Sequence, residues 1–404
     1  MATLKEKLYD ELKLKLALSV EGVNYEHGIF DSVLEEDPML KKFDYCTWDK
    51  QLVTTKQYSV PSSIVLEHGF DVGVVVDRDS PYKIEKASDK DFVVTRNGQL
   101  LSNISFLPSP KFYSKMTSDG TPMRVVGSSL SGLSPDKSVI FGYSTECAVK
   151  DNDETCLFCV MNGTKGLDAP ETRPPWKTSA QISETAKAAY DEGYSHLTIT
   201  GGFIPERREV EYYLDVAESI QLALGVEDFN GQACIGAPMD LSVIDRYKEA
   251  GFSSIGLNTE VWRKEYFDIV CPGKVRMCGG YDNWIKALEH AVKVFGRGKV
   301  RSCFVAGLQP KDVLFEGLEY LASIGVITIA SSWVPGIGSP LEGHRSPTVD
   351  WHWDVQLRHA NLLRKNGFTY KEIFDATPGR GFAHEIYQIE DETLPIFSAI
   401  QDEG

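Results

Sequence analysis

Three cysteines stand close together in the stretch ECAVKDNDETCLFCVMNG, which covers residues 146–163. Cys147, Cys156 and Cys159 have the spacing C-x8-C-x2-C. The number is unusual, because a disulfide uses two thiols and a structural zinc site usually takes four ligands. Three thiolates suit a 4Fe-4S cluster, in which they hold three irons and leave the fourth open for a small bidentate ligand. A zinc site completed by a distant ligand and three unligated thiols are the alternatives.

The segments around these cysteines alternate between short apolar strands and amphipathic helices from about residue 136 onward. Expected strands are KSVIFGYS, SHLTITGG, GQACIGA, FSSIGLNTE, VRSCFVAGL and VITIASSWVP, and the helices between them cover residues 183–192, 207–224, 242–250, 283–295 and 312–323. This alternation predicts an α/β fold, a full or partial (β/α) TIM-type barrel with parallel strands. In such barrels the chemistry lies at the carboxyl ends of the strands, and Cys147 follows the first of these strands.

The first 135 residues follow a different pattern, with short apolar runs separated by Asp, Ser, Gly and Pro. Residues 1–20 read as an amphipathic helix, and Asn97-Gly98 is a typical two-residue hairpin turn between strands. We therefore expect a small N-terminal α+β accessory region over residues 1–135. Residues 136–404 then hold the barrel with a C-terminal extension.

The end of the cysteine motif resembles that of the radical SAM superfamily, which uses S-adenosylmethionine (SAM). That family carries C-x3-C-x-aromatic-C on the loop after the first strand. Phe158 between Cys156 and Cys159 is the aromatic residue here, but the first gap has eight residues instead of three. The motif is therefore an atypical form of the family's cysteine motif.

A second resemblance lies at TITGG, where the second strand ends. Thr200, Gly201 and Gly202 match the Gly-Gly motif whose backbone binds the methionine amino group of SAM in this family. The family's usual acidic third residue is Phe203 here. Glycine suits a place where the backbone approaches a ligand closely, although an ordinary strand-to-loop turn explains it as well.

Later segments resemble the same family in the same order. In GLNTEVWRKEYF, Asn258 and Glu260 match the fourth strand of biotin synthase and lipoyl synthase, where they would bind the ribose hydroxyls or the amino-acid part of SAM. Alternatively, Asn258 or Thr259 caps the following helix. Gly307 in VRSCFVAGLQP resembles the fifth-strand segment whose backbone meets adenine, and WVPGIGSPLEGH resembles the sixth-strand segment with Ser339 in place of Thr.

The resemblance implies a radical SAM enzyme of the biotin synthase and lipoyl synthase branch. Such an enzyme cleaves SAM reductively at a 4Fe-4S cluster, and the resulting 5′-deoxyadenosyl radical abstracts hydrogen from a small-molecule substrate. The electron would come from a one-electron reductant such as flavodoxin or ferredoxin. The alternative to an enzyme is a non-catalytic metal-binding scaffold. Such a scaffold would not need the segments that contact SAM.

A second Fe-S cluster, as in a sulfur-inserting synthase, is a further alternative. Cys234 falls where biotin synthase has its third-strand cysteine, and Arg301 and Cys303 project to one side of the fifth strand. We expect Arg301 and Cys303 to be catalytic; an inward arginine either binds a substrate carboxylate or forms a structural ion pair. Cys271 and Cys278 either complete an unfamiliar site with Cys234 or Cys303, or remain buried thiols.

The composition excludes other classes of partner. Among the 404 residues, 58 Asp and Glu outnumber 42 Lys and Arg, a net charge of −16. Such a surface repels phosphate backbones, so we expect no nucleic acid partner. The chain has no run of 18 apolar residues, its N-terminus has no apolar core, and its first arginine is Arg78. We therefore expect a cytoplasmic protein without a membrane span. The sequence does not specify the oligomeric state.

Overall fold

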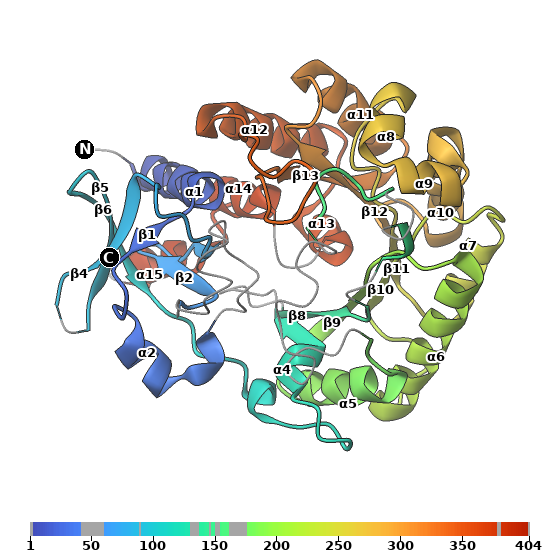
Figure 1. Ribbon diagram of the computed structural model, residues 1–404, viewed down its shortest axis with the longest axis horizontal. Coiled ribbons are helices and arrows are strands. Elements are labelled where there is room, and N and C mark those ends of the chain that lie inside the picture. The colour runs from blue at the N-terminus through green and yellow to red at the C-terminus, as the bar shows by residue number, and fades with distance from the viewer. Residues whose placement is uncertain are drawn as a thin grey trace.

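The structure is a computed structural model that describes residues 3–41, 60–88, 90–129, 137–144, 147–149, 154–160, 176–377 and 381–402. Within these ranges the strands form a mixed N-terminal sheet and a curled, mainly parallel sheet with helices along its outer side (Figure 1). No helix in the described ranges is long and apolar enough to cross a membrane. Cys46 lies outside the described residues.

Helix α1 (Leu4–Glu21) opens the chain, as expected from its pattern. Its first turn is a capping box, because the Thr3 hydroxyl accepts from the Glu6 N–H while the Glu6 carboxylate accepts from the Thr3 N–H. Short helical segments follow at α2 (Asp31–Glu36), and 3₁₀ turns lie at η1 (Pro38–Leu40) and η2 (Lys111–Ser114).

The N-terminal sheet has the strand order β1-β4-β5-β6-β2-β3. Its strands are β1 (Asn24–Tyr25), β2 (Ser63–Leu66), β3 (Asp71–Gly73), β4 (Tyr82–Lys86), β5 (Phe92–Arg96) and β6 (Gln99–Ser105). Asn97 and Gly98 join β5 and β6 with φ of 53° and 79°. Two positive φ values in succession are what a type I′ hairpin turn needs, so the predicted turn is confirmed.

The second sheet is a half barrel, which confirms the predicted partial barrel. Six parallel strands follow one another in chain order, and β7 pairs antiparallel with β8 at one edge. The strands are β7 (Gly127–Ser129), β8 (Lys137–Gly142), β9 (Tyr194–Thr200), β10 (Gly231–Cys234), β11 (Ser254–Gly256), β12 (Val300–Ala306) and β13 (Val326–Ser332). β13 forms the other edge.

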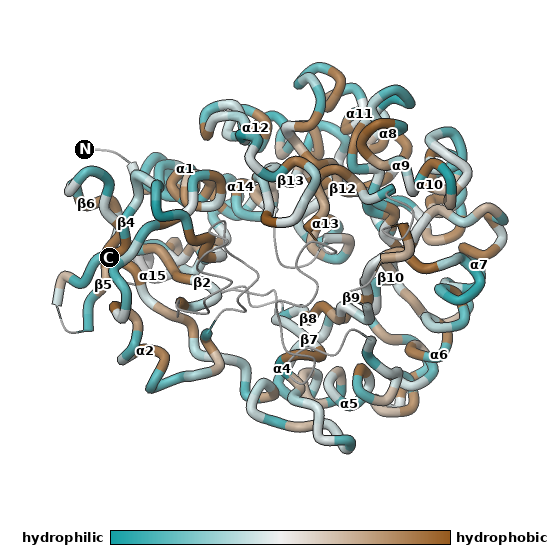
Figure 2. Tube along the Cα trace, in the orientation of Figure 1, coloured by the Kyte–Doolittle hydropathy of each residue, from teal (hydrophilic) through white to brown (hydrophobic). Residues whose placement is uncertain are grey.

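Helices cover the outer side of this sheet and continue beyond its last strand. Helix α4 (Met123–Val126) precedes β7. The helices between the later strands are α5 (Ser179–Tyr190), α6 (Glu206–Leu224), α7 (Val243–Glu249), α8 (Lys264–Val270), α9 (Pro272–Met277), α10 (Gly280–Phe295) and α11 (Lys311–Ser323). The C-terminal helices are α12 (Val349–Lys365), α13 (Tyr370–Ala376), α14 (Phe382–Glu390) and α15 (Pro395–Asp402). Figure 2 shows apolar stretches along the strands and the surrounding helices.

The strands of the half barrel alternate between an apolar outer face and a polar inner face. On β9, Leu197 and Ile199 belong to the core under the helices, whereas His196 and Thr198 alternate with them along the strand and point to the opposite side. Residues of one sheet face alternate along a strand, so Arg301 and Cys303 on β12 share the inner face. The polar interior of the half barrel is called the lumen below.

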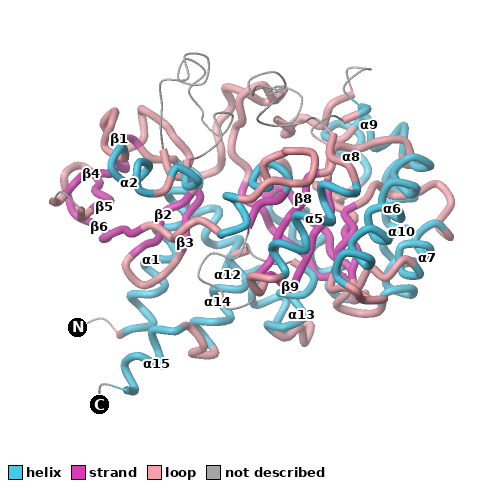
Figure 3. Tube along the Cα trace, turned by 90° about the horizontal axis from the view of Figure 1, so that it is seen from below, coloured by secondary structure: helices cyan, strands magenta, loops and turns pink. Residues whose placement is uncertain are grey.

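A second apolar core joins the N-terminal region to the C-terminal helices. Leu8 of α1 and Val72 of β3 belong to the same buried cluster as Leu363 of α12 and Tyr387 of α14. Figure 3 shows α1, α12 and α14 near one another. The predicted division into residues 1–135 and 136–404 stays a prediction, since this core contains residues from both segments.

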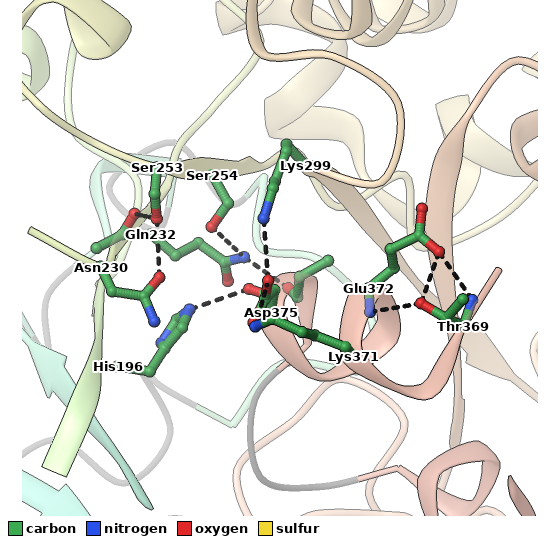
Figure 4. A network of polar contacts seen from close by, with 12 residues as sticks. His196, Asn230, Gln232, Ser253, Ser254, Lys299, Thr369, Lys371, Glu372 and Asp375 are labelled. Carbon is green, nitrogen blue, oxygen red and sulfur yellow. Dashed lines mark hydrogen bonds and ion pairs between the residues drawn. The ribbon is translucent and has the colours of Figure 1, made fainter. Parts of the chain in front are cut away.

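Helix α13 closes the amino end of the half barrel (Figure 4). The backbone oxygen of Asp375 lies 3.0 Å from Nε2 of His196, and the carboxylate of Asp375 lies 3.0 Å from Nζ of Lys299. The side chain of Gln232 donates to the backbone oxygen of Ala376 at 2.5 Å. These partners come from the starts of β9, β10 and β12, so α13 is the floor of the lumen and the carboxyl ends of the strands form its mouth.

Candidate active site

Cys147 follows β8 at the mouth, where it contacts the segment after β9. The backbone N–H of Phe203 donates to Sγ of Cys147 over 3.3 Å, and the N–H of Ala148 donates to the oxygen of Phe203 over 2.7 Å. These bonds fasten the cysteine loop to the neighbouring strand end. An amide that donates to sulfur favours the thiolate, the form that binds metal.

Cys156 and Cys159 lie in a tight turn that packs on α8 and α9. The N–H of Cys159 donates to the oxygen of Cys156 over 3.0 Å, and the N–H of Leu157 donates to the oxygen of Val270 over 2.9 Å. Gly273 comes so close to this loop that a Cβ there would collide with Val149. The glycine is therefore needed for the close approach.

Neighbouring groups shift the pKa values of these thiols in opposite directions. A hydrogen bond with the Cys271 thiol lowers the pKa of Cys156, and the nearby ammonium of Lys274 acts in the same direction. Burial raises the pKa of Cys147, although Phe203 and Lys274 counteract it. Cys271 is hydrogen-bonded to Cys156, and its pairing with Cys234 or Cys303 stays a prediction.

The donor set fits a 4Fe-4S cluster by its chemistry. Cys147, Cys156 and Cys159 are half-buried thiols rather than disulfides, and they come from one loop at the mouth. Among the described residues, no three His, Cys, Asp or Glu side chains converge closely enough to hold one metal ion. Cluster ligands need not converge in that way, because each thiolate binds a different iron. Phe158 lies between two of these cysteines and packs half-buried against the core.

The glycine motif at the end of β9 lies directly beside Cys147. The N–H of Gly202 donates to the oxygen of Ser144 over 3.1 Å, and its oxygen accepts from the Tyr143 hydroxyl over 2.9 Å. The backbone oxygen of Thr200 accepts from the N–H of Tyr143. A Cβ at Gly201 would lie 2.7 Å from the Tyr143 ring. Gly201 is therefore required because any larger residue would collide with the Tyr143 ring. The sequence alone did not reveal this packing constraint.

Asn258 and Glu260 follow β11 and are held by hydrogen bonds to Cys303 of β12. The side-chain oxygen of Asn258 accepts from the N–H of Cys303 over 3.3 Å, and the N–H of Glu260 donates to the oxygen of Cys303 over 2.8 Å. Glu260 adopts φ of 68°, a costly conformation for this residue. Helix α8 has Arg263 as its N-cap residue. The alternative that Asn258 or Thr259 caps the helix is therefore wrong.

Lys274 of α9 is a functional candidate that the sequence analysis missed. Its ammonium donates to the Glu260 carboxylate and to the backbone oxygen of Asn258, both over 2.8 Å, and lies 4.5 Å from the centre of the Trp284 ring. Burial acts to lower the pKa of Lys274, but the Glu260 carboxylate and nearby thiols raise it overall. Lys274 therefore remains a cation beside the cysteine loop. Its stretch, CPGKVRMCGG, drew attention only for its cysteines.

Glu209 of α6 is a second residue that sequence reasoning missed. It is buried behind the glycine motif, accepts from the N–H of Gly236 over 3.3 Å, and is hydrogen-bonded to Tyr143. Burial raises the pKa of Glu209 to about 8. A glutamate in the first turn of an amphipathic helix gives no signal of burial, because acidic residues favour that position in exposed helices as well.

Arg301, Cys303 and Cys234 lie inside the lumen. The Nη2 group of Arg301 donates to Sγ of Cys234 over 2.6 Å. Burial raises the pKa of Cys303 to about 12, so this thiol stays protonated near neutral pH. Gly307 directly follows β12 with φ of 122° and lies beside Pro347. The structure thus brings the cysteine loop, the glycine motif, Asn258, Glu260 and Gly307 to the mouth, whereas Arg301 lies deeper.

A separate cavity of about 350 Å³ lies between the edge of β13 and the N-terminal region. It is lined by residues 328–332 of β13, by Asp71 and Gly73 of β3, and by Lys15 of α1. His359 and His384 also line it. The edge strand of the half barrel and the edge strand of the N-terminal sheet therefore face the same space.

Comparison with known proteins supplies a family for this geometry. Residues 147–314 match the model of the radical SAM superfamily. Bacteriochlorophyllide c C-7(1)-hydroxylase from Chlorobaculum limnaeum is 25% identical over 335 residues, which cover 78% of this chain and 80% of that protein.

Comparison with solved structures found matches of low identity. Methylornithine synthase gives a TM-score of 0.43 at 17% identity, covering 61% of this chain and 68% of that one. The FeFe-hydrogenase maturase from Carboxydothermus hydrogenoformans gives 0.44 at 14% identity, covering 59% and 56%. The family match itself begins at Cys147 and includes Asn258, Glu260 and Gly307. Residues 147–314 therefore form a radical SAM domain, and the protein is an enzyme of this class.

Proposed function

We propose that Cys147, Cys156 and Cys159 hold three irons of a 4Fe-4S cluster whose fourth iron takes SAM. The family implies both the cluster and SAM. The observation that carries the proposal is the hydrogen bond from Phe203 to Cys147, because it joins the cysteine loop to the Gly201-Gly202 segment. When bound, the cluster and SAM supply a 5′-deoxyadenosyl radical, which removes a hydrogen atom from the substrate.

The chain's own residues prepare this site electrostatically. The N–H of Phe203 and the ammonium of Lys274 both favour the thiolate at Cys147, and Cys271 favours it at Cys156. A cluster held by three thiolates carries negative charge, and Lys274 compensates part of it from a buried position. Lys274 also keeps the Glu260 carboxylate in place at the mouth.

We assign the contacts with SAM to the residues that surround the cysteine loop. Both backbone groups of Gly202 and the carbonyl of Thr200 are bonded within the protein, so Gly201 is the better partner for the methionine amino group. Asn258 and Glu260 would bind the ribose hydroxyls or the amino-acid part, Gly307 would meet adenine, and Phe158 would pack at the edge of the site. The order of these segments along the strands supports this assignment.

A sulfur-inserting synthase with an auxiliary cluster is the second candidate. The contact between Arg301 and Cys234 favours it, because it brings a thiol and a cation together inside the lumen, with Cys303 on the same inner face. This candidate would also support the proposed relation to the biotin synthase and lipoyl synthase branch.

For the substrate, we propose a small molecule that extends from the lumen toward the cavity beside β13. Ile329 and Ser331 of β13 line that cavity, and Ile329 is paired in register with Cys303. The curated relative is named as a hydroxylase of bacteriochlorophyllide c. We propose that this enzyme acts on an unactivated carbon of its substrate. Its reductant would be a flavodoxin or ferredoxin in the cytoplasm.

The test is anaerobic reconstitution of the full chain with iron and sulfide, followed by addition of SAM and dithionite. We expect about four irons per chain and formation of 5′-deoxyadenosine, measured by liquid chromatography and mass spectrometry. An iron content near six or eight would favour the auxiliary-cluster candidate. A chain that binds the cluster but forms no 5′-deoxyadenosine contradicts the proposal.

A further inference from the structure

We propose that the lumen binds an anionic group of the substrate, such as a carboxylate, at Arg301. This inference rests on the proposed function, because it names the chemical class of the substrate that would lie below the reactive site.

The inner faces of β10 and β12 border an open space. Arg301 and Cys303 keep part of their surface exposed, whereas Ser302 and Phe304, which alternate with them, are fully buried. On β10, Cys234 is partly exposed and its neighbour Ala233 is buried. Exposure confined to the inward positions means that a small molecule can reach this side of the sheet.

Arg301 has no carboxylate partner within the described residues. Its Nη2 group bonds Cys234, and its Nε group is buried without any hydrogen-bond partner. Glu260, whose charge acts on Arg301, is already paired with Lys274 at 2.8 Å. A partly buried cation without a compensating anion is costly, and a guanidinium prefers a bidentate carboxylate partner.

Other polar atoms of the lumen also lack partners. The hydroxyl of Thr198 on β9 and Nδ1 of His196 are buried and make no hydrogen bond within the described residues. Gly256 opposite Arg301 leaves room for the guanidinium, since a Cβ there would lie 2.7 Å from Nε and 3.3 Å from Sγ of Cys234. These atoms can orient a polar ligand that Arg301 attracts.

The depth of Arg301 fits a role in holding one end of a substrate. Arg301 lies three residues before Phe304, which forms a bridge with Glu260 at the mouth, so Arg301 is roughly 10 Å below that contact at the usual rise of a strand. Below it, Gln232 is buried and bonded to α13 and to Ser254, so the floor is closed. An anion at Arg301 would leave the rest of the substrate directed toward the mouth.

The test compares an anionic with a neutral reagent at Cys234, the residue that contacts Arg301. The purified chain without added cofactors is treated with iodoacetate or iodoacetamide, and labelling of Cys234 is followed by peptide mass spectrometry, with glutathione as the reference thiol. If Arg301 attracts anions, iodoacetate should label Cys234 about tenfold faster than iodoacetamide relative to glutathione. Because both reagents react with the same thiol, the ratio of the iodoacetate rate to the iodoacetamide rate does not depend on the reactivity of that thiol.

The variants decide whether Arg301 is the cause. Arg301→Gln should abolish the preference for iodoacetate, whereas Arg301→Lys should retain it because it keeps the charge. Lys299→Gln removes an equal charge at the floor and should leave the preference unchanged. Malonate should protect Cys234 in the wild type but not in Arg301→Gln.

Three outcomes overturn the proposal: no preference in the wild type, the same preference in Arg301→Gln, or no labelling by either reagent, which would mean a closed lumen. All of these readings are independent of SAM cleavage. The enzyme can therefore fail this test and still form 5′-deoxyadenosine, so the two proposals fail separately.

Discussion

The two ends of the half barrel use polar residues in opposite ways. At the floor, His196, Gln232 and Lys299 each bond to a group of α13, and Figure 4 shows these contacts converging on one helix. At the mouth, Cys147 and Cys156 are thiols that receive hydrogen bonds, and Lys274 supplies a buried positive charge. These floor residues bond to groups within the protein, whereas at the mouth the hydrogen bonds to sulfur and the Lys274 ammonium favour negative charge on the thiols.

This difference separates stability from chemistry along a single sheet. Buried polar groups that are fully paired rigidify a fold, whereas groups with shifted pKa values beside a cleft are candidates for function. Changes at the mouth should therefore reduce activity more than changes at the floor. Changes at the floor should alter stability or its pH dependence and spare SAM cleavage.

The largest effect is expected at the cysteine loop. Cys156→Ala should lower the rate of 5′-deoxyadenosine formation by more than about 100-fold, because a cluster ligand is lost. Cys278→Ala is the matched control: burial raises the pKa of Cys278 to about 12, so this thiol stays protonated and is a poor ligand. The control should keep most of the rate. Equal rates in the two variants would show that the wrong ligands were chosen.

The next effect concerns the buried pair at the mouth. Lys274→Met leaves the Glu260 carboxylate buried without a cation, which should cost about 3–5 kcal/mol in the free energy of unfolding. The double variant Lys274→Met/Glu260→Gln removes both charges and should recover part of that loss. Urea denaturation measures both. A loss below about 1 kcal/mol in the single variant would mean that solvent screens Glu260.

At the floor, acid should destabilise the fold through His196. Burial lowers the pKa of His196 to about 4, from an ordinary value near 6.5. Between these two values the unfolded chain binds a proton that the folded chain does not, so stability falls as the pH falls. The loss from this residue should reach about 3 kcal/mol near pH 4. Urea titrations at several pH values give the slope of the free energy of unfolding against pH, which counts the protons taken up on unfolding. His196→Gln should reduce that uptake by about one proton between pH 4 and pH 6.5. An unchanged slope would contradict this origin.

The smallest effect is expected for the ion pairs of α13. Asp375→Asn removes the partner of Lys299 and Lys371, whose side chains are 38% and 82% exposed. Because solvent screens such pairs, the cost should be about 1 kcal/mol. Thermal unfolding measures it, with 5′-deoxyadenosine formation expected to be unchanged. A strong loss of SAM cleavage in this variant would break the contrast between floor and mouth.

The sequence predicted the half barrel and the position of the cysteine loop because both depend on local patterns. Alternating apolar strands and amphipathic helices specify a parallel sheet, and Cys147 directly follows one such strand. The inward orientation of Arg301 and Cys303 also follows from the period of a strand. These features need no knowledge of distant contacts.

The remaining features depend on contacts between distant segments. Lys274 became a site candidate only through its bond to Glu260, and Cys271 only through its contact with Cys156. The floor formed by α13 and the core shared by α1 with α12 and α14 bring together residues more than a hundred positions apart. No local pattern encodes such partners, so sequence reasoning stopped at the strand ends.

The central claim is that three cysteines at the mouth leave one iron of the cluster open to SAM. The most direct test is the electron paramagnetic resonance spectrum of the reduced, reconstituted enzyme with and without SAM. We predict the spectrum of a 4Fe-4S cluster that changes when SAM is added and is absent when Cys147, Cys156 and Cys159 are all replaced by Ala. A cluster spectrum that SAM leaves unchanged, or one that survives this triple replacement, would contradict the account.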